Sequence, residues 1–213
     1  MTPRGWLPAL ATVIVADVGA MLYSAATGRM QLVLGLAALF AAVMTAAAIA
    51  INRPLWRYDG PSLKAPQHGL GINARLMALV YFWGALAMQG LYTTRLTGMK
   101  WQHGWQYASA MLLLAIGALV FAWGLGSHDD ARRNYFSALA VPLAIFQGIS
   151  AAFGVLFLVV SSKLTAVRAD WGANQVFLFG ALTVMVLAAV SLRTHSRLVR
   201  GDAGRVPGRL SGP

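Results

Sequence analysis

The chain has 213 residues, of which 58% are hydrophobic and only 11% charged, with a formal net charge of +11 and a mean hydropathy of +0.64. A soluble globular domain carries about 25% charged residues, so this chain cannot cover a water-facing surface, and we predict a polytopic α-helical membrane protein. It contains no cysteine and no glutamate, which excludes disulfides, iron–sulfur ligation and thiolate catalysis.

Six apolar segments follow one another along the chain, each close to the roughly 20 residues that cross a bilayer. They are Trp6–Ala26, Met30–Ile51, Leu76–Thr94, Trp105–Leu125, Tyr135–Ser161 and Gly172–Leu192. We therefore predict an all-α fold in which residues 1–192 form a bundle of six transmembrane helices, with three tandem helical hairpins as one arrangement. Residues 193–213 are predicted to form a basic cytoplasmic tail.

The charged residues lie between these segments and predict the orientation. Twelve lysines and arginines fall on the side that holds both termini, and five fall on the other side. The positive-inside rule then places both termini in the cytoplasm, as in a bacterial inner-membrane protein. We expect these side chains to contact anionic lipid headgroups rather than nucleic acid. A cleaved signal peptide is the alternative for the first segment, because Arg4 precedes an apolar run, but a retained span fits the charge distribution better.

Asp17 lies within the first apolar segment. At 1.5 Å per residue it sits roughly 15 Å into a hydrocarbon core about 30 Å thick. A charge at that depth costs about 2.5–3.5 kcal/mol on insertion scales, and no lysine or arginine lies deep in any segment. Asp17 is therefore either protonated and hydrogen-bonded, which is a structural role, or it lines a hydrated cavity that binds a proton or cation.

Two glutamines lie deep in the third and fifth segments. Gln89 and Gln147 are each roughly 20 Å from the cytoplasmic end by the same counting, and a carboxamide offers two donors and an acceptor. They could join helices or bind a polar solute. Pro142, five residues before Gln147, lacks an N–H and is predicted to kink its helix. Asp17, Gln89 and Gln147 are thus the candidate lining of a polar route through the bundle.

Small residues spaced four apart predict close helix contacts, because they let backbones approach in lipid. Such stripes occur in three segments: Thr12, Ala16, Ala20 and Ser24; Ala38, Ala42, Ala46 and Ala50; and Ala140, Ala144, Gly148 and Ala152. We expect tight packing along all three.

The histidines and the glycine-rich string of the sequence do not predict a binding or reactive site. The four histidines (His68, His103, His128 and His195) lie in connectors or just beyond a segment end, so axial haem ligation within the bundle is not supported. The GxGxxA string at residues 69–74 follows no strand, and we expect Asn73 to cap the third span. The sequence therefore predicts no catalytic residue, no metal site and no cofactor.

Three function classes remain. The first is a carrier or channel for a proton, cation or small polar solute, using Asp17, Gln89 and Gln147. The second is a non-catalytic membrane subunit or assembly factor, which packs by its small-residue faces against a copy of itself or a membrane complex. An intramembrane enzyme has the least support, because no nucleophile–base pair is present.

Overall fold

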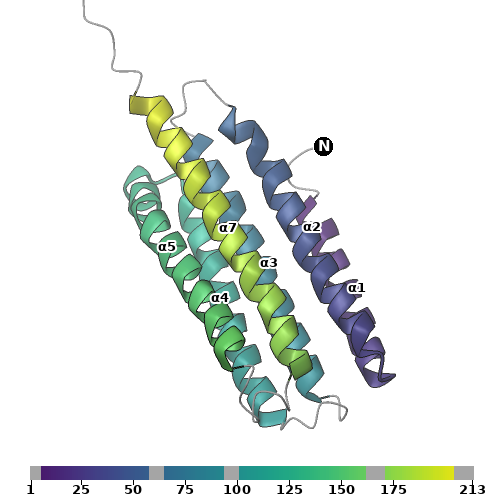
Figure 1. Ribbon diagram of the computed structural model, residues 1–213. Helices are drawn as coiled ribbons and strands as arrows, with labels where there is room; N and C mark the ends of the chain where they lie inside the picture. Colours follow the sequence, from purple (N-terminus) through teal and green to yellow (C-terminus); the bar gives the residue numbers. More distant parts are fainter. Residues whose placement is uncertain (1–5, 58–64, 94–100, 162–170, 204–213) are drawn as a thin grey trace, which may run out of the picture.

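The computed structural model describes residues 6–57, 65–93, 101–161 and 171–203, and in this part of the chain all secondary structure is α-helical (Figure 1). The helices are α1 (Trp6–Ala26), α2 (Met30–Trp56), α3 (Ala65–Thr93), α4 (Trp101–Leu125), α5 (Asp130–Ser161) and α7 (Trp171–Ala203). Each of these six is long and apolar enough to span a membrane. The predicted all-α transmembrane bundle is confirmed, and the chain is an integral membrane protein.

Helix α3 forms the centre of the bundle. In its most apolar stretch 67% of the residues are buried, whereas in the corresponding stretch of α5, at the edge of the bundle, 11% are buried. Sequence neighbours pair as α1–α2, α3–α4 and α5–α7, and α7 also packs on α2 and α3. In Figure 1, α1 and α2 lie on one side, α5 lies on the other, and α3 and α7 run between them.

Helix α1 matches its predicted segment at both ends, α2 begins and α4 and α5 end where predicted, and the other helix ends differ from the prediction. Helix α2 continues through Pro54 to Trp56, and α3 begins at Ala65. The prediction that Asn73 caps the third span is therefore wrong, because Asn73 lies inside α3. Helix α7 runs past Leu192 to Ala203, so that the beginning of the predicted tail is helical. The division into a 1–192 domain and a 193–213 tail stays a prediction.

The small-residue stripes behave differently in the three helices. In α5 the prediction is confirmed: Ala140 and Ala144 are buried, and a Cβ added at Gly148 would lie 3.4 Å from the Ala188 Cβ of α7. In α1 and α2 it is wrong, since most stripe members are exposed: Thr12, Ala16, Ala20, Ala42, Ala46 and Ala50. The buried residues of these two helices combine larger side chains with small ones: Ile14, Val18, Met21, Ser24 and Ala25 in α1, and Val33, Ala37, Phe40, Met44 and Ala48 in α2.

Two glycines mark the closest helix approaches to α3. A Cβ added at Gly104 of α4 would lie 2.3 Å from the Tyr92 Cβ, and one added at Gly90 would lie 2.2 Å from a Leu22 methyl of α1. Both distances are far below van der Waals contact, so these crossings depend on the absence of a side chain.

Candidate functional site

The side chain of Asp17 in α1 is hydrogen-bonded to a residue of the central helix, α3. Trp83 Nε1 donates a hydrogen bond to Asp17 Oδ2 (2.9 Å). The Trp83 side chain is fully buried, and its ring stacks on Phe40 of α2 with centroids 4.0 Å apart and planes 3° from parallel. Asp17 therefore joins α1 to α3 through an indole N–H. This contact favours the structural role among the two that the sequence leaves open.

Gln89 lies near the opposite end of α3 from Asn73 and faces α4. Its Oε1 atom is buried without a hydrogen-bond partner among the described residues and would lie 3.3 Å from a Cβ added at Gly104. The oxygen thus rests against the backbone at the close α3–α4 crossing. This location separates Gln89 from Asp17, which faces α3 from the α1 side.

A polar cluster that sequence reasoning missed joins α2, α3 and α7. Asn52 and Asn73 exchange hydrogen bonds between their carboxamides (2.8 and 3.0 Å), and Thr194 Oγ1 donates to Asn52 Oδ1 (2.7 Å). Trp56 Nε1 donates to Thr194 Oγ1 (2.9 Å), and the Arg193 guanidinium lies 4.2 Å from the Trp56 ring centroid. Asn52 and Thr194 have no exposed surface, so this cluster fixes one end of the bundle.

Two cavities lie among α3, α4, α5 and α7. The first, which we name the Asn73 chamber, has a volume of about 240 Å³ and takes its polar groups from Asn73, Gln147 and Ser191. The second, the Tyr81 chamber, has a volume of about 230 Å³ and takes them from Tyr81, Gln147 and Ser150. The rest of both linings is apolar or glycine.

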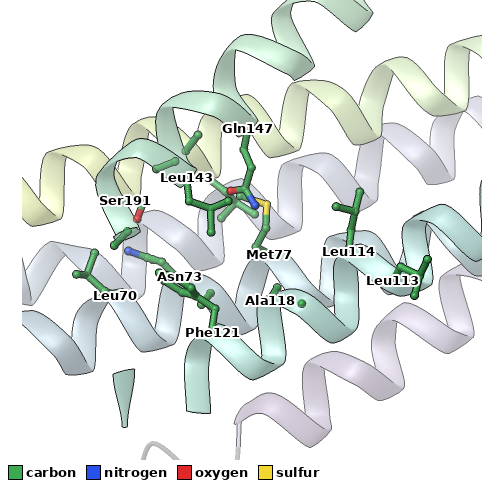
Figure 2. Close-up of a pocket in the computed structure, with 16 residues that line it drawn as sticks. Leu70, Asn73, Met77, Leu113, Leu114, Ala118, Phe121, Leu143, Gln147 and Ser191 are labelled. Atoms are coloured by element: carbon green, nitrogen blue, oxygen red, sulfur yellow. The ribbon is translucent and has the colours of Figure 1, made fainter. Parts of the chain in front are cut away.

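Gln147 lies at the junction of the two chambers. It lines both of them, as do Leu114 and Leu143. Figure 2 shows its carboxamide reaching into the Asn73 chamber beside Met77. Among the described residues, no group hydrogen-bonds to this carboxamide. Its donors and acceptor are therefore free to bind a molecule that enters either chamber.

Pro142 lies on the exposed side of α5, and the helix continues through it. The missing N–H leaves the carbonyl of Ala138 without its helical donor. Leu143, the next residue, lines both chambers. The kink itself stays a prediction.

The three predicted lining residues do not form one site. Gln147 borders the chambers directly, and Asp17 reaches them only through Trp83, whose ring lines the Tyr81 chamber. Gln89 lines neither chamber. Among the described side chains, no group of three histidine, cysteine or acidic residues could hold a metal ion.

In comparisons with known proteins, the chain matches no protein-family model, no curated protein and no solved structure.

Proposed function

We propose that this integral membrane protein is a carrier for a small uncharged molecule, which it binds in the paired chambers beside Gln147. The observation that carries the proposal is the free carboxamide at the chamber junction. Gln147 is half-buried within a membrane-spanning helix, where a polar group without a hydrogen-bond partner is unfavourable, and a bound ligand that accepts or donates a hydrogen bond would reduce this cost. A cavity of mostly apolar walls with a few placed polar groups is the usual form of a small-molecule site.

The chamber linings indicate that the bound molecule carries no charge. Among the residues that the structure describes, neither chamber has a lysine, arginine, histidine, aspartate or glutamate in its wall. An ion that enters such a cavity loses its hydration without gaining a counter-charge, which is strongly unfavourable. Within the carrier class, a neutral solute therefore has more support than a proton or cation.

For the orientation, we propose the bacterial inner membrane with both termini in the cytoplasm. The support is the charge distribution of the sequence, with its excess of lysine and arginine on the side of the termini. On that side these residues would contact anionic lipid headgroups.

The test is solute flux into proteoliposomes that contain the purified protein. Light scattering after mixing with glycerol, urea or formamide measures the entry of neutral solutes, and an internal pH-sensitive dye measures protons. We expect Gln147→Leu to abolish the flux of the neutral solute that wild type carries. Gln89→Leu is the matched control, because the same change in α3 touches neither chamber. Equal flux in Gln147→Leu and wild type would refute the proposal.

A specific observation also favours the second class, a non-catalytic subunit or homo-oligomer. The stripe Ala42, Ala46 and Ala50 on α2 is exposed, and so are Ala16 and Ala20 on α1. Small-residue stripes of this kind mediate helix association in lipid. In this case Ala46→Leu would dissociate a complex that wild type forms in mild detergent, and native mass spectrometry would show the loss. A wild-type protein that is monomeric and copurifies with no partner would contradict this alternative.

A further inference from the structure

The mouth of the chambers lies on the surface that faces lipid. Leu113 of α4 is 70% exposed and Phe146 of α5 is 68% exposed, and these residues line the Asn73 and Tyr81 chambers respectively. Both positions are well inside their membrane-spanning helices. Large apolar side chains exposed at mid-span contact hydrocarbon rather than water. The opening between α4 and α5 therefore leads into the bilayer core.

Open space at this mouth is also seen at Gly117 of α4. Gly117 lines the Asn73 chamber, yet a Cβ added there would meet no atom within 4 Å. Further along, α4 and α5 are in contact through Phe121 and Phe136, whose rings meet edge to face with centroids 5.5 Å apart. The two helices are thus joined beside one end of the opening, while the opening itself stays free.

The walls of the Tyr81 chamber suit a flat ring. Aromatic side chains come from Tyr81, Trp83, Phe146 and Phe177, and Met88 and Met111 add thioethers. Aromatic rings attract other rings in offset or edge-to-face contact, and methionine sulfur contacts ring edges favourably. Either chamber is larger than the engineered cavity of about 150 Å³ that holds benzene, so a six-membered ring fits.

The polar groups of the chambers are suited to donate hydrogen bonds to a carbonyl oxygen. Among the described residues no acceptor meets the two N–H donors of Gln147, and Tyr81 lines the second chamber. Asn73 gives one of its two amide protons to Asn52, which leaves the other for the first chamber. A neutral ring with carbonyl groups would accept these bonds without the cost of burying a charge.

From these observations we infer that the chambers bind a lipid-soluble, neutral carbonyl ring of the quinone class, which enters sideways from the bilayer between α4 and α5. The ring occupies a chamber with a carbonyl oxygen on the Gln147 carboxamide, and an apolar tail extends past Leu113 and Phe146 into lipid. This inference rests on the proposed binding site and names its ligand class.

The experiment measures binding of a short-tailed benzoquinone to the full-length protein in nanodiscs of neutral phospholipid, with empty nanodiscs as the baseline. The same ring with a carboxylate at the end of its short tail is the charged comparison. We expect saturable binding of the neutral probe, weakening of about tenfold in Gln147→Leu for the loss of one hydrogen bond, and little binding of the anion.

A second pair of variants tests the entry route. Gly117→Leu would fill the mouth, and Gly35→Leu on α2 is its matched control, because Gly35 also has no atom within 4 Å of an added Cβ and lines neither chamber. We expect Gly117→Leu to lose at least tenfold in affinity while Gly35→Leu binds like wild type. Equal weakening in both variants would overturn lateral entry.

The outcomes separate this inference from the carrier proposal. If nanodiscs with the wild-type protein retain no more of the probe than empty nanodiscs do, the inferred ligand class is overturned. If flux of a polar solute still depends on Gln147, the carrier proposal survives that result. Saturable, Gln147-dependent binding of the neutral ring upholds the ligand class even where no solute flux is found, and the carrier proposal alone then fails.

Discussion

Replacing Asn52 with leucine tests whether the polar cluster holds α2, α3 and α7 together. Asn52 makes three hydrogen bonds to other helices, two with Asn73 and one with Thr194. Hydrogen bonds between membrane helices average about 0.6 kcal/mol in double-mutant cycles. Three such bonds predict that Asn52→Leu lowers the free energy of unfolding by about 2 kcal/mol.

A double-mutant cycle isolates the carboxamide pair. The single variants Asn52→Leu and Asn73→Leu each remove both bonds of the pair, so the double variant loses them only once. The two bonds predict a coupling free energy of about 1 kcal/mol. Unfolding by addition of a denaturing detergent to mixed micelles, followed by helical circular dichroism, measures all four proteins. If the losses of unfolding free energy in the two single variants sum, within error, to the loss in the double variant, the reciprocal pairing is refuted.

The same unfolding assay checks two further predictions. Asp17→Asn keeps an acceptor for the Trp83 N–H and should change the unfolding free energy by less than about 1 kcal/mol, whereas Asp17→Leu leaves that donor unpaired and should cost about 1–3 kcal/mol. Equal losses of unfolding free energy in the two Asp17 variants would contradict the structural role of Asp17. Abolished flux in a stable Asp17→Asn protein would instead make Asp17 a transport site. Gly104→Ala forces a Cβ against Tyr92 and should cost about 1–3 kcal/mol, while Gly117→Ala, in open space, should be neutral or stabilising.

The number and location of the spans could be predicted because bilayer thickness constrains them directly. A helix must cover the hydrocarbon core with apolar residues, and the first predicted segment matches α1 at both ends. The polar start of α3 was not predicted to be helical, whereas the spacing of Arg193, Arg197 and Arg200 did indicate a helical extension of the last span, which α7 confirms. At these ends the helices extend beyond the predicted apolar segments. The polar side chains of Asn52, Asn73 and Thr194 hydrogen-bond to one another there instead of facing lipid.

Helix faces could not be read from residue size alone. Alanine is common throughout this chain, so a four-residue spacing of small side chains arises in helices that pack in different ways. In α1 and α2 the predicted stripes are mostly exposed, and the buried faces include larger residues such as Met21 and Phe40, whose ring stacks on Trp83 of α3. In α5 the predicted stripe does meet a neighbour, since Gly148 lies against Ala188 of α7, while α4 buries alanines that were not predicted to pack: Ala108, Ala115, Ala118 and Ala122.

The hydrogen-bond partners of the polar residues could not be predicted from the sequence either, and they change how these residues are interpreted. Asp17 and Asn73 both carry groups that would be costly in lipid, and each is satisfied by one side chain on a neighbouring helix. Each of them therefore has a packing partner at its depth in the bundle. The Gln147 carboxamide shares that cost, yet it lies in a cavity wall with no protein partner among the described residues. Packing does not account for Gln147, and this is why the ligand proposal rests on it.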